Sequence, residues 1–176
     1  MSRDRRLAVA SSAALSYEQV GATAGDLPTA YRHVRRSHDL GVGRAVFDGA
    51  ARSLMTWQVH RRAGLTVDAT TPQARAEAVV VLGVGVGRLR LHAPCRVVQV
   101  LDGPDRCGFA YGTLVGHPES GEERFEVTID AEGQVRFILT AFSRPATWWG
   151  RLGSPVGRRV QDRITDRYVA ALAART

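Results

Sequence analysis

The stretch GFAYGTLVGHPESGEERFEVTI, residues 108–129, decides the fold class. It contains two runs in which apolar side chains recur at every second position, separated by the turn-forming sequence GHPESG. Alternation of this kind is typical of strands with one buried face, and a turn rich in Gly and Pro between two such runs favours a hairpin. Residues 108–129 are therefore predicted to form two neighbouring strands of an antiparallel sheet.

The alternation also separates two neighbouring carboxylates, Glu122 and Glu123. Phe125 and Val127 define the apolar phase of the second run, and Glu123 shares this phase whereas Glu122 does not. Successive side chains of a strand point to opposite faces of the sheet. Glu123 is therefore predicted to face the buried side, and Glu122 to face solvent.

A hairpin register with Thr113 opposite Glu123 and Tyr111 opposite Phe125 makes the two inward faces agree. Tyr111, Thr113 and Glu123 then form a polar group at one end of an apolar face, with His117 in the turn. A buried carboxylate needs partners, so a structural role, in which Glu123 pairs with turn amides or with an arginine, remains an alternative. The candidate ligand-binding residues are Phe109, Tyr111, Thr113, His117, Glu123 and Phe125, with Arg96 as a possible ion-pair partner and Trp148 as a possible gate.

The rest of the chain predicts a long meander between helices. Residues 65–143 contain seven strand-like runs separated by short turns, which implies antiparallel neighbours. Residues 44–62 predict one amphipathic helix, and residues 25–43 a connector that is extended or partly helical. Residues 155–173 repeat an apolar side chain every four positions and predict a long C-terminal helix. The expected fold is α+β, with a curved sheet wrapped around that last helix.

Length and composition predict one cytoplasmic domain. A chain of 176 residues with 44% apolar residues can bury one core, which we place in residues 15–176 behind a disordered tail, residues 1–14. The two cysteines are too few for a disulfide framework and are expected to be free thiols. No stretch approaches the ~20 apolar residues of a membrane-spanning helix.

Several classes of function find no support in the sequence. The run GVGVG, residues 83–87, lacks the spacing of a dinucleotide-binding loop, and the five histidines lack metal-ligand spacing, so neither a cofactor nor a metal is expected. All 24 basic residues are arginines, concentrated toward the two ends of the chain. They are spread without interleaved aromatic residues, which disfavours nucleic acid or an anionic membrane as the partner.

Five segments resemble one known family. They are YEQVGAT (17–23), HRRAGL (60–65), APCRVVQV (93–100), GFAYGTLVGHPESGEERF (108–125) and AFSRPATWW (141–149). In these segments the chain resembles the family called domain of unknown function 1990, over about residues 15–173. This family is similar to the START-like and birch-pollen-allergen-like proteins. The resemblance implies the helix-grip fold and provides no catalytic residues to transfer.

The leading hypothesis is a protein that binds a small, largely apolar molecule between the sheet and the last helix, oriented by Glu123 and Tyr111. An alternative is an enzyme that uses the same cavity for acid–base chemistry of the cyclase, isomerase or hydrolase kind. Glu123 would be the acid or base, and Tyr111 or His117 its proton partner. The sequence does not decide whether a reaction is catalysed, and it names neither the ligand nor the oligomeric state.

Overall fold

Seven strands and several helices make up the described part of the chain. The computed structural model describes residues 1–85, 90–146, 167, 168 and 170–172. The strands are β1 (Arg32–Val42), β2 (Thr66–Ala69), β3 (Val79–Val84), β4 (Leu91–Asp102), β5 (Arg106–Thr113), β6 (Glu119–Ile129) and β7 (Gln134–Pro145). The helices are α1 (Arg3–Ser12), the short 3-10 helix η1 (Ala22–Ala24), α2 (Arg44–Met55) and α3 (Gln58–Arg62).

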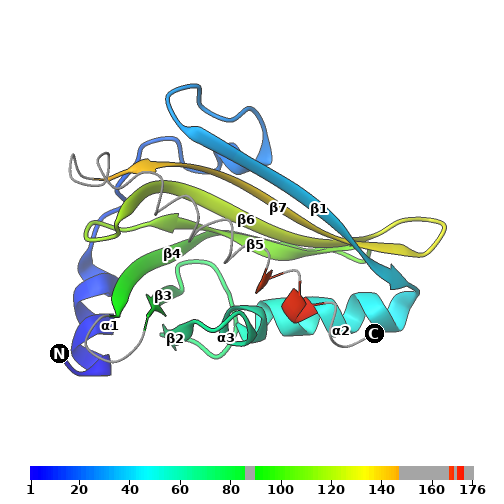
Figure 1. The fold of residues 1–176 in the computed structure, drawn as a ribbon, viewed down its shortest axis with the longest axis horizontal. Helices are drawn as coiled ribbons and strands as arrows, with labels where there is room; N and C mark the ends of the chain where they lie inside the picture. The colour runs from blue at the N-terminus through cyan, green and yellow to red at the C-terminus, as the bar shows by residue number, and fades with distance from the viewer. Residues whose placement is uncertain (86–89, 147–166, 169, 173–176) are drawn as a thin grey trace.

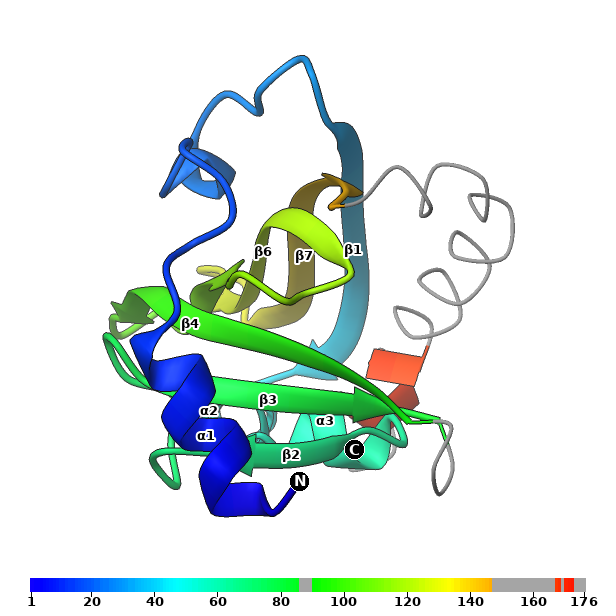
Figure 2. The same ribbon diagram turned by 90° about the vertical axis from the view of Figure 1, so that its left-hand side faces the viewer.

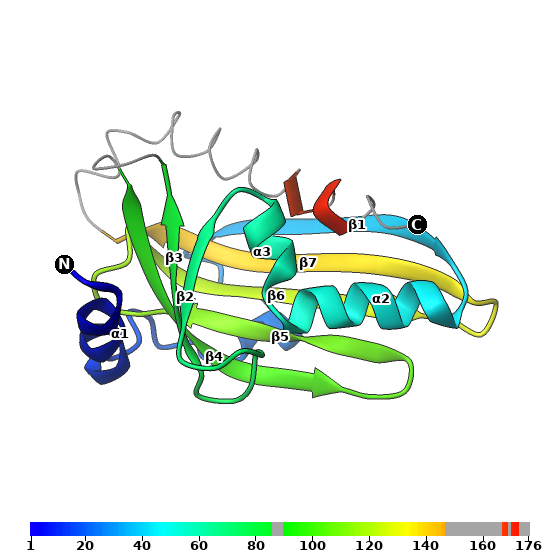
Figure 3. The same cartoon turned by 90° about the horizontal axis from the view of Figure 1, so that it is seen from below.

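The strands form one antiparallel sheet in the order β1-β7-β6-β5-β4-β3-β2. The sheet is strongly curved, and α2 and α3 lie on its concave side (Figures 1 and 3). The antiparallel meander predicted from the strand runs is confirmed, but two of the seven runs, on either side of Pro94, join in the single strand β4. Of the predicted helix over residues 155–173, residues 167, 168 and 170–172 are described and are helical, and the rest lies outside the described residues.

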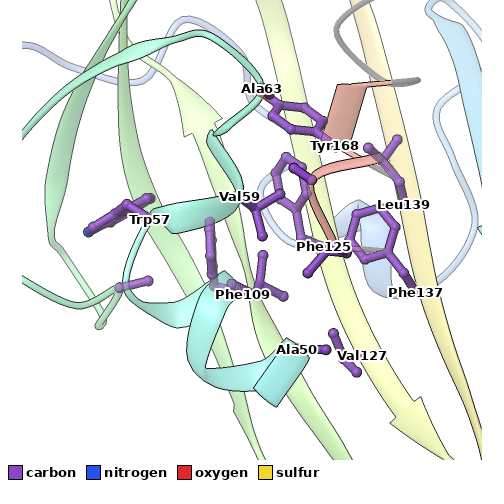
Figure 4. Close-up of a cluster of buried hydrophobic side chains, with 14 of the residues drawn as sticks. Ala50, Trp57, Val59, Ala63, Phe109, Phe125, Val127, Phe137, Leu139 and Tyr168 are labelled. Carbon is purple, nitrogen blue, oxygen red and sulfur yellow. The ribbon is translucent and has the colours of Figure 1, made fainter. Parts of the chain in front are cut away.

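The concave face carries the main core. Large side chains from three strands meet those of the α2–α3 region there, and Trp57, Phe109, Phe125 and Phe137 are fully buried. Figure 4 shows Phe125 in the middle of this cluster, where its ring contacts Phe137 on β7 and Tyr168 near the end of the chain. Burial of these rings stabilises the packing of the sheet against the helices.

Residues 32–42, predicted as part of a connector, form the edge strand β1 instead. This strand pairs with β7 along its whole length, with a β-bulge between Asp39 and Gly41. Only Val34 and Leu40 of its side chains are buried, and most of the others are polar and exposed. β1 is therefore extended because it pairs with β7, and its own sequence favours a strand only weakly. Two widely spaced apolar residues give little alternation from which a strand could be predicted.

The single helix predicted for residues 44–62 is broken at Trp57. This residue adopts a left-handed backbone conformation, with φ 64°, between α2 and α3. The break turns the indole ring into the core, where it is fully buried, and its Nε1–H donates a hydrogen bond to the carbonyl of Thr71 at 3.3 Å. The break was not predicted because the apolar pattern of the sequence continues through Trp57, and both helices bury the same face.

The first residues, predicted as a disordered tail, form α1. The side chain of Ser2 caps this helix, and Ala10 packs with Val79, Val81 and Leu114 on the outer face of the sheet. Figure 2 shows α1 lying across β2 and β3. The physical reason is that β3 is apolar on both faces, so its outer face needs a cover. None of the described helices is long and apolar enough to cross a membrane.

The prediction of free cysteines is confirmed. Cys95 is buried on β4, where it pairs with Thr113, and Cys107 on β5 pairs with Asp102. The two thiols therefore occupy distant positions along the β4–β5 ladder.

Candidate functional site

The candidate site is built around a Tyr–Glu pair on the concave face. Tyr111 on β5 and Glu123 on β6 lie directly opposite each other, and the Tyr111 hydroxyl donates a hydrogen bond to Glu123 Oε2 at 2.8 Å. The predicted register, with Thr113 opposite Glu123, is therefore wrong by two residues. A shift of two preserves the side-chain phase, so Glu123 still faces the same side as Phe125, as predicted.

Small side chains adjoin Glu123 on this face. Ala141 on β7 pairs with Glu123, and two positions along the ladder, on the same face, Gly121 pairs with Ser143. Cys95 lies across the sheet on β4. Large rings fill the core on the other side, toward α2 and α3, beginning with Phe125. As a whole residue Glu123 is half-buried, while Phe125 beside it is fully buried.

The surroundings of Glu123 favour its neutral form. Burial raises the pKa of its carboxyl group to about 7, the hydrogen bond from Tyr111 opposes this rise, and the nearby charge of Glu119 adds to it. Burial also raises the pKa of Tyr111, Tyr168 and Cys95, and the charge of Glu123 raises each further. At neutral pH the site therefore holds a carboxyl group poised between its two protonation states.

This shift predicts a pH-dependent stability. Glu123 has a higher pKa in the folded than in the unfolded chain, so its stabilising contribution is complete below the unfolded value and is lost as pH rises through about 7. Between pH 5 and pH 8 the free energy of unfolding should fall by about 2 kcal/mol more in the wild type than in Glu123→Gln. Urea unfolding at both pH values measures this. Parallel pH profiles for the two proteins would contradict the assigned shift.

Glu122 is buried on the outer face, which corrects the prediction that it faces solvent. It accepts hydrogen bonds from the Tyr17 hydroxyl at 2.7 Å, from the backbone N–H of Gly21 at 2.7 Å and from that of Thr23 at 3.1 Å. The Thr23 hydroxyl is a fourth donor. These residues form what we call the Glu122 clamp. The strand phase was right, but the segment before β1 folds over the outer face and covers this carboxylate.

The other predicted site residues do not join Glu123. Thr113 uses its hydroxyl to bind the backbone of Gly121 and lies 2.6 Å from the hydroxyl of Ser16. Arg96 donates to the carbonyls of Ser11 and Ala13 at the end of α1, so it is no partner of Glu123. Its phase along β4 places it on the face opposite Cys95. Trp148 lies outside the described residues.

His117 lines a different hollow, which we call the outer groove. This groove has a volume of about 1160 Å³. Its walls come from residues 15–19, 28–31, 115–118 and 144–146, with Leu91 and Ser120. His117 Nδ1 lies 2.9 Å from the backbone of Glu119, and burial lowers the pKa of its imidazole to about 4. The histidine is therefore neutral and engaged in the turn.

Sequence reasoning missed His60 in α3. Its ring is fully buried, with centroids of Phe125 and Tyr168 at 5.2 and 5.1 Å, and burial lowers its pKa to about 3. Neither ring nitrogen has a hydrogen-bond partner in the described part of the chain. A lone histidine gives no sequence signal of this kind, because Phe125 and Tyr168, which pack around its ring, are distant in the sequence. The described residues contain no group of His, Cys, Asp and Glu that could hold a metal ion.

Comparison with known proteins places the chain in a family. Residues 16–171 match the family described as "Domain of unknown function (DUF1990)". A UPF0548 protein of Deinococcus radiodurans is 36% identical over 168 residues, which cover 89% of this chain and 85% of that protein.

Solved structures resemble the fold at much lower identity. A hypothetical protein of Helicobacter pylori matches with a TM-score of 0.63 at 8% identity, covering 81% of this chain and 86% of that one. An aromatase/cyclase of a Streptomyces species matches with a TM-score of 0.54 at 21% identity, covering 82% and 92%. These likenesses show the helix-grip fold of START-like and birch-pollen-allergen-like proteins. The chain belongs to the DUF1990 (UPF0548) family.

Proposed function

We propose that the chain binds a small, largely apolar molecule on the concave face of the sheet, with Glu123 and Tyr111 as the polar anchor. The observation that carries this proposal is the carboxyl group of Glu123 on the same face as the main apolar core, hydrogen-bonded to Tyr111. A carboxyl group with one donor among the described residues is costly at such a place. A bound molecule that offers a second polar contact would reduce this cost.

The residues of the concave face around Glu123 support a largely apolar ligand. Binding sites for small molecules are mostly apolar, with a few polar groups that fix orientation. Around Glu123 the polar group is the hydroxyl of Tyr111, and the wall consists of Ala141, Val34 and Phe125. This combination suits a molecule with an apolar body and one polar end.

Acid–base catalysis in the same place is the second candidate. The pKa of about 7 for Glu123 supports it, since general acids and bases work best when their pKa lies near the ambient pH. Tyr111 is the adjacent proton partner, whereas His117 lies in the outer groove. In this case Glu123→Gln would abolish conversion of a bound molecule and retain binding. The aromatase/cyclase shares the fold, which carries no activity over to this chain.

The binding proposal predicts where an apolar probe will be found. N-phenyl-1-naphthylamine, which is neutral and fluoresces in apolar surroundings, should bind at one site. In methyl NMR spectra it should shift the signals of Val34, Leu139 and Ala141, which belong to the concave face. The methyl groups of Leu15, Leu91 and Val115 line the outer groove and serve as the matched control, with unchanged shifts.

Two outcomes would contradict the proposal. Shifts confined to the control methyl groups would assign binding to the outer groove. An absence of saturable fluorescence would mean that no site on this chain accepts such a molecule.

A further inference from the structure

Glu123 differs from the buried residues Glu122 and Glu126 in how little compensates its charge. Glu122 has four hydrogen-bond donors, and Glu126 forms ion pairs with Arg106 and Arg124. Glu123 has one donor, Tyr111, and no ion pair within the described residues. An anion inside a protein is unfavourable without a cation beside it, and ionised Glu123 has no such countercharge among the described residues.

The groups that face Glu123 supply no positive charge. They are Tyr111 on β5, Cys95 on β4 and Tyr168 near the C-terminus, with Glu119 on the same strand. All four are neutral or acidic at neutral pH. Arg96 lies against α1 and Arg124 beside Glu126 on the outer face, and Arg62 on α3 donates to Ser53 on α2. The negative potential at Glu123 is therefore not cancelled by the described part of the chain.

Aromatic rings beside the carboxyl group add to this potential. The centroid of Tyr111 lies 5.3 Å from that of Phe125, which lies 5.4 Å from that of Tyr168. The faces of such rings are electron-rich and attract cations. A carboxylate next to a cluster of aromatic rings is complementary to a molecule that combines a positive charge with an apolar body.

We infer that the ligand of the concave face is a cationic amine with an apolar, aromatic or alkyl body, whose ammonium group pairs with Glu123. This inference rests on the proposed function and specifies the ligand class of the same site. The ammonium group would supply the missing countercharge, while Tyr111 keeps its hydrogen bond to the carboxylate. A neutral ligand would leave the charge of Glu123 uncompensated, and an anion would meet repulsion.

The amine should bind more tightly at higher pH. It requires ionised Glu123, so binding is complete above the pKa of this carboxyl group, about 7, and is lost as pH falls through it. At lower pH the incoming ammonium group must expel the proton from Glu123. Tyr111, Tyr168 and Cys95 have raised pKa values and stay neutral over this range, and the described residues that face Glu123 include no histidine with a pKa near 7.

Three molecules of similar shape and different charge test the inference. They are 2-phenylethylamine, 2-phenylethanol and phenylacetate, each used to displace N-phenyl-1-naphthylamine from the full chain. At pH 8 the amine should bind the wild type at least about tenfold more tightly than the alcohol, and phenylacetate most weakly. In Glu123→Gln the amine should lose this advantage. Glu132→Gln, an exposed glutamate in the turn after β6, is the matched control and should retain it.

A second variant keeps the test independent of any loss of folding in Glu123→Gln. Tyr111→Phe removes the only described donor to the carboxylate, so the pKa of Glu123 should rise and the midpoint of amine binding should move to higher pH. An unchanged midpoint would assign the titration to another group and overturn the inference.

The outcomes separate this inference from the proposed function. If the alcohol displaces the probe as well as the amine does, the ligand class is wrong and the apolar site stands. If the amine still binds more tightly than the alcohol in Glu123→Gln, another group binds the ammonium group and the inference fails. If none of the three displaces a probe that binds the concave face, the inference also fails. If the probe itself does not bind there, the proposed function fails with it.

Discussion

Glu122→Ala is expected to lower the free energy of unfolding by about 4 kcal/mol. The substitution removes the acceptor of the whole Glu122 clamp and leaves the donors of Tyr17, Gly21 and Thr23 unpaired. Tyr17 and Thr23 are only 6% and 5% exposed, so water cannot replace the carboxylate without opening the segment. Urea unfolding monitored by circular dichroism measures the loss.

Amide exchange gives a local check on the same prediction. The backbone N–H groups of Gly21 and Thr23 should be protected in the wild type and exchange rapidly in Glu122→Ala. Glu132→Ala changes an exposed glutamate in a turn and should be nearly neutral. A loss below about 1 kcal/mol for Glu122→Ala would contradict the role of the clamp.

Gly108→Ala is expected to cost about 3 kcal/mol, because the added methyl group has no room between two central strands. A Cβ at this position would overlap the carbonyl oxygen of Phe125 and lie 2.9 Å from Cα of Glu126. Both are backbone atoms of β6, so no side-chain rotation can relieve the contact and β5 must move away from β6. Chemical denaturation of the purified variant measures the cost.

The same substitution at Gly49 is the matched control. Gly49 lies on α2 with nothing within 4 Å of an added Cβ, and alanine favours a helix by up to about 1 kcal/mol over glycine. Gly49→Ala should therefore be neutral or stabilising. Equal stability of the two alanine variants would show that β5 and β6 have more space between them than the structure gives.

The sequence predicted strands β2 to β7 well and missed the edge strand β1. Large apolar side chains recur at every second position of β6, and Phe109 and Tyr111 share one phase of β5, so the sequence pattern was enough to predict both strands. β1 buries only Val34 and Leu40 and owes its conformation to pairing with β7. Long-range pairing of this kind leaves almost no trace in local composition.

At the candidate site, phase was predictable and partners were not. The alternation correctly placed Glu123 on the same face as Phe125. It could not fix the register, because a shift of two residues leaves every side chain on the same face. Tyr111, and not Thr113, is therefore the residue opposite Glu123. The burial of Glu122 depends on the segment from Tyr17 to Thr23, which has no periodic pattern. His60 is buried against Phe125 and Tyr168, which are distant from it in the sequence.

The position of Glu122 and Glu123 on opposite faces of β6 limits how this strand can change in evolution. Inserting or deleting one residue between this pair and Phe125 would exchange the two faces, leaving the clamp without its acceptor and the concave face without its carboxyl group. Length changes in members of the family should therefore collect in the turns that flank β6. Within β6 itself, family members should differ by substitutions and not by insertions or deletions.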